Sequence, residues 1–144
     1  MRLAVIGAGG WGTALSILAA RGGHEVRLWA RGAAVVEEIN GRRLNSTYLA
    51  AREIPEGVRA TRDAREALRG AEVVILAAPS HVTRGVLEGL RGGVEPGAVL
   101  VSATKGVEAE TVKRISEVVG EVLGEGAAAA TCDGRVRAGR ARPT

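Results

Sequence analysis

The feature that most constrains this chain is a glycine-rich hexapeptide near its start. Residues 7–12, GAGGWG, have the spacing G-x-G-x-x-G; they follow the apolar residues 3–6 and precede the helix-favouring segment 13–21. A buried strand, a glycine turn and a helix in this order are typical of the first strand–helix unit of a dinucleotide-binding sheet. The sequence therefore predicts an α/β fold with a pyrophosphate site at the start of that helix.

The three spaced glycines have different expected roles. Gly7 permits a tight turn, Gly9 lets the backbone approach a pyrophosphate, and Gly12 lets the helix pack closely on the sheet. The N–H groups of the first helical turn have no partner inside the helix and lie at the positive end of its dipole. We therefore predict that the turn binds the phosphates of a dinucleotide.

Strand and helix signals alternate along the chain. Strands are predicted at 3–6, 25–29, 58–61, 72–78 and 99–102, and helices at 13–21, 33–40, after Asp63, up to Leu90 and at 110–123. This alternation is typical of a doubly wound parallel sheet, the Rossmann fold. We assign residues 1–126 to one dinucleotide-binding domain of this class.

The last eighteen residues differ in composition from the rest. Residues 127–144 are rich in Ala, Gly and Arg, show no helical or alternating apolar pattern, and carry a net charge of +3 out of +4 for the chain. We expect a disordered basic tail here, so that the sixth strand of the fold is missing. The body is nearly neutral and the chain has only three aromatic residues, which argues against a nucleic-acid partner.

Composition also suggests a location. No apolar run has the roughly 18 residues that a membrane span requires, and only two residues precede the first strand. Cys132 is the single cysteine, so the chain has no disulfide framework. We expect a cytoplasmic protein with no membrane partner, and we assign no metal site.

Arg31 follows the second predicted strand, where NAD-selective sites carry an acidic side chain for the ribose. A guanidinium at this point suits the 2′-phosphate of NADP, so we favour NADPH over NADH. The alternative is a solvated arginine with no role in binding. Glu37 and Glu38 lie too far into the next helix to be first choices for the ribose, and we expect them on a solvated face.

Two further strand ends carry candidate site residues. Pro79 stops the fourth predicted strand, so that Ser80 and His81 line the nicotinamide side of a cleft. His81 suits a general base, but a cap or surface role is the stronger interpretation. Lys105, one of two lysines in the chain, follows the fifth strand and suits a phosphate ligand, the alternative being an ordinary surface residue.

Together these motifs resemble the N-terminal domain of the bacterial-type NAD(P)-dependent glycerol-3-phosphate dehydrogenases. The resemblance covers about residues 1–125 and rests on 4–15 (AVIGAGGWGTAL), 23–29 (GHEVRLW), Asn45 with Tyr48 and Leu49, 78–81 (APSH) and 103–106 (ATKG). It implies hydride transfer between NAD(P)H and dihydroxyacetone phosphate, giving sn-glycerol 3-phosphate for phospholipids. It also implies cofactor contacts at Gly10, Trp11, Arg31 and Tyr48, and contacts with both cofactor and substrate at Lys105.

The chain departs from the family pattern in three places. The family usually has Ser where Gly10 stands, and Pro-Gly where Ala50 and Ala51 stand. The Ser-Gly-Pro motif of the sixth strand does not appear after Gly126, nor does the helical substrate domain, which in the family supplies the catalytic lysine and allows a homodimer. We therefore expect a truncated cofactor-binding domain that contains no catalytic residue and is inactive alone.

Other functions stay open from the sequence. One alternative is a non-enzymatic NADP-binding module, which would bind NADPH tightly without turnover. Another is a different dehydrogenase of the same fold, such as a hydroxyacyl-CoA or ketopantoate type, which the residues around Lys105 disfavour. A third is a nucleic-acid binder that uses the arginine tail, which would be retained on DNA in a salt-dependent manner.

Overall fold

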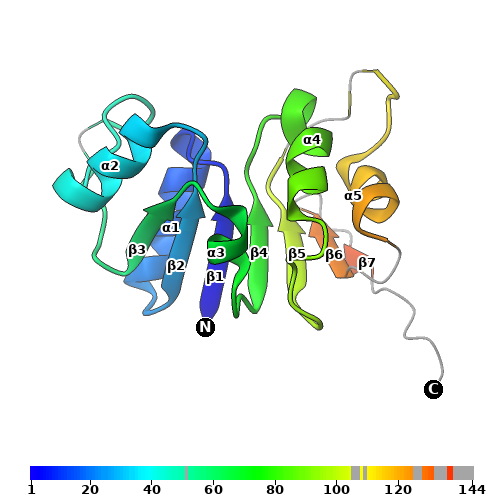
Figure 1. The fold of residues 1–144 in the computed structure, drawn as a ribbon, viewed down its shortest axis with the longest axis horizontal. Helices are drawn as coiled ribbons and strands as arrows, with labels where there is room; N and C mark the ends of the chain where they lie inside the picture. Colours follow the sequence, from blue (N-terminus) through cyan, green and yellow to red (C-terminus); the bar gives the residue numbers. More distant parts are fainter. Residues whose placement is uncertain (51, 105–107, 109, 125–127, 132–135, 138–144) are drawn as a thin grey trace.

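The structure is a computed structural model that describes residues 1–50, 52–104, 108, 110–124, 128–131 and 136–137. These residues form a single seven-stranded sheet with helices on both faces (Figure 1). The elements in chain order are β1 (Arg2–Ile6), α1 (Gly10–Arg21), β2 (Glu25–Trp29), α2 (Ala33–Arg42), β3 (Val58–Thr61), α3 (Ala64–Leu68), β4 (Val73–Leu76), α4 (Ser80–Leu90), β5 (Val99–Ser102), α5 (Ile115–Leu123), β6 (Ala128–Thr131) and β7 (Val136–Arg137).

The strand order is β3-β2-β1-β4-β5-β6-β7, and β1 to β6 are all parallel. The order reverses between β1 and β4, which are neighbours in the sheet although two strands separate them in the sequence. This is the doubly wound Rossmann arrangement that the alternating pattern predicts. The reversal leaves a crevice outside the carboxyl ends of these two strands, because their crossover helices leave in opposite directions.

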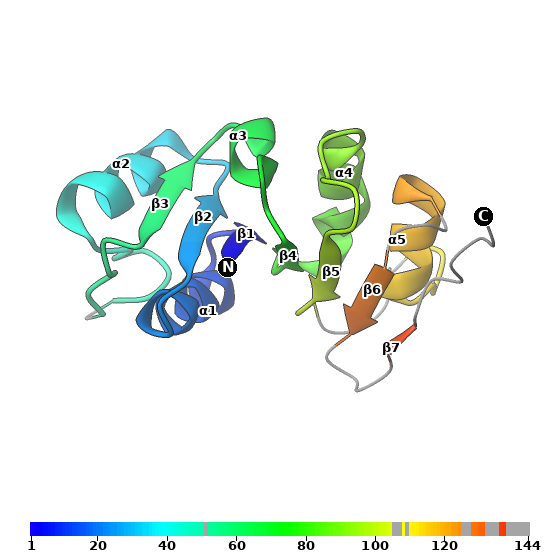
Figure 2. The same ribbon diagram turned by 90° about the horizontal axis from the view of Figure 1, so that it is seen from below.

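Two hydrophobic clusters cover the two faces of the sheet. Alternate residues of β1 point to opposite faces, so Val5 packs with Ile17 of α1 and Ile39 of α2, while Ile6 packs with the other cluster. That second cluster contains Leu87 of α4 and residues of α3 and α5. Figure 2 shows α1 on one side of the sheet and α3, α4 and α5 on the other. Both faces are therefore buried, as a parallel sheet requires.

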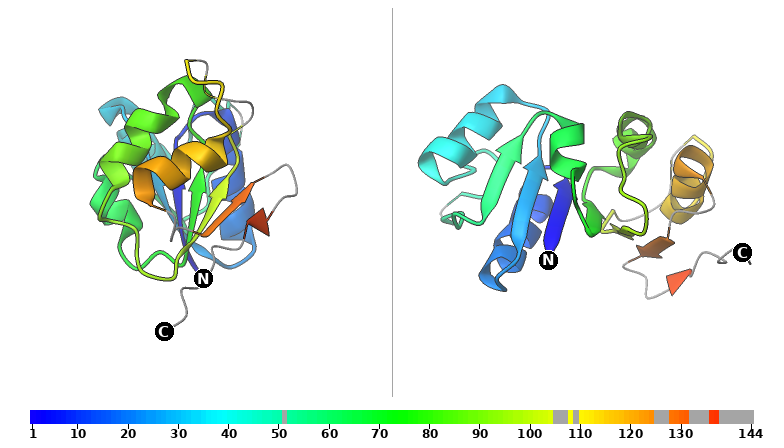
Figure 3. Two further views of the ribbon diagram at one scale, coloured as in Figure 1. Left: turned by 90° about the vertical axis from the view of Figure 1, so that its right-hand side faces the viewer. Right: turned by 60° about the horizontal axis from the view of Figure 1, so that its bottom comes forward.

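The expectation that the sixth strand is missing is wrong. β6 lies in the segment assigned to the tail and pairs in parallel with β5, with Ser102 opposite Thr131; β7 then pairs antiparallel with β6. Figure 3 shows both strands at the end of the sheet opposite β3. Alanine has a low strand propensity, so the local sequence gives little signal. The edge of β5 offers unpaired backbone groups that accept a neighbouring strand whatever its side chains are.

The last helix begins later than the sequence suggests. We expected a helix over 110–123, but α5 begins at Ile115 with Arg114 as its N-cap. Val112 adopts a left-handed conformation with φ of 56°, which a β-branched residue rarely does and which no α-helix contains. Residues 110–113 therefore belong to a turn before the helix, and Lys113 is part of that turn. By contrast, α3 begins directly after Asp63 as predicted, and Asp63 is its N-cap, accepting hydrogen bonds from the N–H groups of Arg65 and Glu66.

Candidate cofactor-binding site

A cleft with a volume of about 990 Å³ lies at the carboxyl ends of the parallel strands. The register explains its position, because Ile6 lies opposite both Trp29 and Leu76, and Leu76 lies opposite Ser102. The loops after β1, β2, β4 and β5 therefore begin at one edge of the sheet, and all four contribute to the walls of the cleft. Its size is in the range of pockets that hold small ligands and cofactors.

The cleft gathers most of the residues that the sequence singles out. Seven predicted cofactor-binding residues line it together: Gly7, Gly9, Gly10, Trp11, Arg31, Tyr48 and Pro79. Ser80, His81 and Thr104 line it as well. Gly12 does not line the cleft. The prediction for Lys105 lies outside the described residues.

The glycine turn is held by very close contacts. Gly7 has φ of 119°, and a Cβ there would lie 2.9 Å from the backbone carbon of Ala77 on the neighbouring strand end. A Cβ on Gly12 would lie 1.9 Å from the carbonyl oxygen of Gly7, so α1 starts directly against the turn that precedes it. Neither position tolerates a side chain. The close approach expected at Gly12 is present, although its nearest partner is the turn itself rather than the sheet.

The two middle glycines face different surroundings. No atom lies within 4 Å of the place where a Cβ of Gly9 would be, so the backbone there is open to the cleft. A Cβ on Gly10 would lie 2.9 Å from the carbonyl oxygen of Tyr48. The lack of a side chain at Gly10, a departure from the family pattern, thus lets the loop that carries Tyr48 come close to the turn.

The start of α1 is suited to an anion. Gly9 is its N-cap and provides no side-chain cap, no acidic residue lies in the first turn, and the first intrahelical bond runs from the Thr13 N–H to the Gly9 carbonyl. The N–H groups of residues 10–12 therefore have no acceptor within the helix. They lie at the positive end of the helix dipole, beside the cleft.

Asn45 is a buried residue that hydrogen-bonds to the glycine turn and to α1. Its Nδ2 donates to the carbonyl oxygen of Ala8 at 3.0 Å and to Oγ1 of Thr13 at 2.9 Å, and both Asn45 and Thr13 are fully buried. Asn45 lies in the connection between α2 and β3, more than 30 residues from either partner. In the sequence, Asn45 stands out only as part of a family motif. No local pattern identifies it as a site residue, because its partners are distant in sequence.

Among the described residues, no acidic side chain lines the cleft, including the end where Arg31 lies. The exposed Arg31 lines the cleft, and its carbonyl oxygen accepts a hydrogen bond of 3.1 Å from Nε of Arg62. Glu37 is exposed, as expected, and Glu38 is half-buried, with a carboxylate that accepts hydrogen bonds from the N–H and the hydroxyl of Ser46 at 2.7 and 2.6 Å. The bond from the hydroxyl, followed by that from the N–H, lowers the pKa of Glu38.

The other end of the cleft is formed by α4 and the end of β5. Pro79 is the N-cap of α4, and Oγ1 of Thr83 donates to its carbonyl oxygen at 2.9 Å. Oγ1 of Thr104 donates to the carbonyl oxygen of Ala78 at 2.8 Å and so joins the loops after β4 and β5. His81 is exposed in the first turn of α4.

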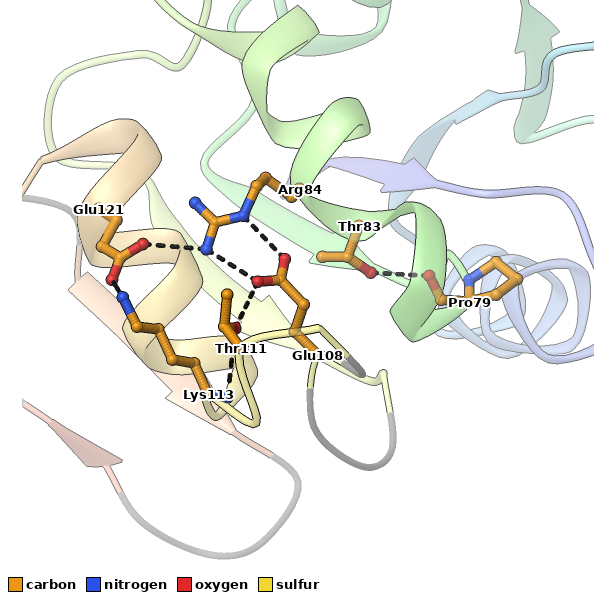
Figure 4. A network of polar contacts seen from close by, with 7 residues as sticks. All are labelled: Pro79, Thr83, Arg84, Glu108, Thr111, Lys113 and Glu121. Atoms are coloured by element: carbon orange, nitrogen blue, oxygen red, sulfur yellow. Dashed lines mark hydrogen bonds and ion pairs between the residues drawn. The ribbon is translucent and has the colours of Figure 1, made fainter.

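A network of charged side chains begins on α4, the helix whose N-cap Pro79 lines the cleft (Figure 4). Arg84 of α4 binds both carboxylate oxygens of Glu108, at 2.8 and 2.9 Å, and also binds Glu121 of α5 at 2.9 Å. Thr111 donates to Glu108, and Lys113 pairs with Glu121. The network therefore connects α4, the turn before α5, and α5 itself.

The charges in this network reinforce one another. The hydrogen bonds from Arg84 and then Thr111 lower the pKa of Glu108, although the burial of its carboxylate acts in the opposite direction. Lys113 and then Arg84 lower the pKa of Glu121. In return Glu108, and to a smaller extent Glu121, raise the pKa of Arg84. All of these groups are therefore charged at neutral pH.

Two negative findings apply to the described ranges. Within them, no group of His, Cys, Asp and Glu side chains is arranged to hold a metal ion. None of the helices that the structure describes combines the length and the apolar character that a bilayer crossing demands.

The fold and the cleft define a dinucleotide-binding domain of the Rossmann class. Residues 2–136 match the family model of the NAD-dependent glycerol-3-phosphate dehydrogenase N-terminus. The chain belongs to this family. The match extends through β6 to the first residue of β7, which agrees with the place of β6 in the sheet.

Individual relatives agree with this assignment. The chain is 43% identical over 126 residues to a glycerol-3-phosphate dehydrogenase [NAD(P)+] of Corynebacterium urealyticum, which covers 88% of this chain and 38% of the relative. It is 48% identical over 123 residues to the enzyme of that name from Koribacter versatilis, which covers 85% of this chain and 36% of the relative. The chain thus spans less than two fifths of the length of the curated relatives it matches.

Solved structures distinguish this family from other dehydrogenases of the same fold. Glycerol-3-phosphate dehydrogenase from Coxiella burnetii superposes with a TM-score of 0.83 at 30% identity, over 90% of this chain and 39% of that one. A ketopantoate reductase from Ralstonia eutropha gives a TM-score of 0.69 at 26% identity, over 91% of this chain and 40% of that one. The likeness to the ketopantoate type, one of the alternatives considered above, is therefore the lower of the two.

Proposed function

We propose that this chain is the part of a glycerol-3-phosphate dehydrogenase that binds NADP(H) or NAD(H), with NADPH preferred. The observation that carries the proposal is the start of α1, where Gly9 has open backbone and the N–H groups of Gly10 and Trp11, two residues that line the cleft, have no helical acceptor. A pyrophosphate placed there accepts hydrogen bonds from the backbone and lies at the positive end of the helix dipole. Gly7 and Gly12 contribute by permitting this conformation.

The remaining cleft residues divide between the two ends of the cofactor. At one end Arg31 offers a guanidinium to the 2′-phosphate, and Glu38 is hydrogen-bonded to Ser46. At the other end Pro79 and Thr104 border the space for the nicotinamide. Trp11 and Tyr48 are both more than half exposed on the cleft wall, so their rings are accessible for packing on the cofactor.

The reaction proposed for the complete protein is reversible hydride transfer between NAD(P)H and dihydroxyacetone phosphate, giving sn-glycerol 3-phosphate. The nicotinamide supplies the hydride when it is bound. Residues of this chain orient the cofactor, and we propose that Lys105 contacts both cofactor and substrate. We assign no catalytic residue to the 144 residues, so the chain alone binds nucleotide without turnover. For the complete protein we propose a homodimer in the cytoplasm. Sedimentation in solution tests whether it is a dimer.

Titration of the purified chain with NADPH and with NADH tests the cofactor assignment. Binding quenches the fluorescence of Trp11 and Trp29, both of which line the cleft. We expect Arg31→Ala to weaken NADPH binding by about tenfold, since a hydrogen bond between charged groups contributes about 1.5–3 kcal/mol, and to affect NADH much less. Equal losses for the two cofactors would remove the 2′-phosphate role of Arg31, and no binding of either would overturn the proposed function.

A further inference from the structure

Asn45 joins the two ends of the glycine turn through one nitrogen atom. Its Nδ2 binds the Ala8 carbonyl, which precedes α1, and the Thr13 hydroxyl in the first turn of α1. A primary amide carries two hydrogens on this nitrogen, so it can donate to both acceptors at once. Neither an aspartate nor a serine at this position provides two donors.

The bond to Ala8 determines which way the next N–H points. The peptide bond between Ala8 and Gly9 is trans, and in a trans peptide the C=O and the N–H point in opposite directions. The Ala8 carbonyl points toward the buried Asn45, so the Gly9 N–H points away from it. Gly9 lines the cleft, whereas Asn45 does not.

The remaining atom of the amide indicates why this residue type stands here. Among the described residues, the buried Oδ1 of Asn45 has no hydrogen-bond partner, although buried polar atoms almost always have one. An acceptor left without a partner costs stability. Asn45 is therefore poorly explained by stability alone, whereas its two donors match the carbonyl and hydroxyl of the turn.

We propose that Asn45 is a positioning residue for the pyrophosphate site. It holds the peptide between Ala8 and Gly9 so that the Gly9 N–H faces the cleft, without touching the cofactor itself. The inference rests on the proposed function, since it assigns Asn45 to the same binding site.

A matched pair of variants tests this role. Asn40 also spans two elements with its amide, since its Nδ2 donates to the Ala60 carbonyl and its Oδ1 accepts from the Ala60 N–H, but it does not line the cleft or contact the turn. We expect Asn45→Ala to weaken binding of ADP-ribose, which carries the pyrophosphate, by about tenfold. Asn40→Ala should change that affinity by less than about twofold. It should nevertheless lower the melting temperature at least as much as Asn45→Ala does.

A pH series separates positioning from a loss of packing. In Asn45→Asp the ionised side chain only accepts hydrogen bonds and repels the Ala8 carbonyl, whereas the protonated acid can donate to it. We expect ADP-ribose binding to this variant to be weak at pH 8 and to recover several-fold toward pH 5, with wild type and Asn40→Asp nearly constant. A pH-independent loss in Asn45→Asp, or unchanged affinity in Asn45→Ala, would overturn the proposal.

A measurement on the wild-type chain covers the case in which the variants do not fold. The amide resonance of Gly9 should shift on saturation with ADP-ribose, while that of Gly23, in the turn between α1 and β2, should not. If ADP-ribose binds but the Gly9 amide resonance does not shift, the role of Asn45 is contradicted and the proposed function is not. Absence of ADP-ribose binding to the wild-type chain contradicts the proposed function instead.

Discussion

The two sides of the cleft are held in place by different forces. On the side of β1 and α1, the backbone fits so closely that a single Cβ on Gly12 would lie 1.9 Å from the Gly7 oxygen, and the neutral amide of Asn45 completes the contact. On the side of β4 and α4, Arg84 binds two carboxylates on the turn before α5 and on α5 itself. Close packing and ion pairing respond to different perturbations, so each side can be disturbed separately.

The ion-paired side has a predictable dependence on pH. The pKa values of Glu108 and Glu121 are lowered in the folded protein from an ordinary value of 4.5. A lowered carboxyl pKa contributes stability that is fully present above the unfolded value and is lost as the pH falls through the folded value. The closely packed side contains no such group in its contacts with the turn, so its contribution should not change over this range.

The largest effect is expected from Gly12→Ala. The added methyl group would overlap the backbone carbonyl of Gly7, and neither atom is at the end of a flexible side chain. We expect a loss of about 3 kcal/mol or more in the free energy of unfolding, together with loss of NADPH binding. Urea denaturation followed by circular dichroism measures the first quantity. A stability equal to wild type would show that the turn yields easily and would remove the contrast between the two sides.

Gly9→Val should remove binding but not folding. No atom lies within 4 Å of the new Cβ, and the backbone of Gly9, with φ of −73° and ψ of −173°, is one that valine readily adopts. The side chain would instead fill the space where the pyrophosphate approaches the backbone. We expect NADPH affinity to fall at least about 100-fold, the value of about two charge-assisted hydrogen bonds, with an unchanged melting temperature. Retained affinity would place the phosphates elsewhere in the cleft.

Arg84→Gln should weaken the other side in a manner that depends on pH. At pH 7 we expect a melting temperature a few degrees lower than that of wild type, because Glu108 and Glu121 lose their common partner. The difference should shrink as the pH falls below about 4.5, where the carboxylates of the wild type become protonated. Arg27→Gln, which removes one ion pair to the half-exposed Glu25, is the matched control. A difference constant from pH 7 to pH 3 would show that Arg84 acts by packing alone.

The smallest expected effect has the opposite sign to the first. Gly85 lies within α4, and no atom lies within 4 Å of the place where its Cβ would be. Gly85→Ala should therefore raise the free energy of unfolding by about 0.5–1 kcal/mol, since alanine loses less backbone entropy in a helix. The same thermal or urea experiment that measures Gly12→Ala measures this change. A destabilised Gly85→Ala would mean that α4 also has a tightly packed face at this position.

Much of the fold and part of the site could be predicted because the signals are local. The alternation of apolar strands and helices indicates the doubly wound sheet, and the spacing of Gly7, Gly9 and Gly12 indicates the turn. The carboxyl ends of parallel strands meet at one edge, so Arg31 and Pro79 were expected to lie at one cleft, and both line it. The family resemblance is confirmed by the match over residues 2–136.

The sequence by itself determined the alternation of strands and helices and the conformation of the glycine turn, because these depend on neighbouring residues and on side chains that are absent. Only the tertiary structure decided that the alanines of β6 form a strand, that Glu38 binds Ser46, and that Asn45 reaches the Ala8 carbonyl. Each of these depends on a backbone or side-chain partner brought near by folding, and a partner distant in sequence leaves no periodic signal in the residues that will meet it.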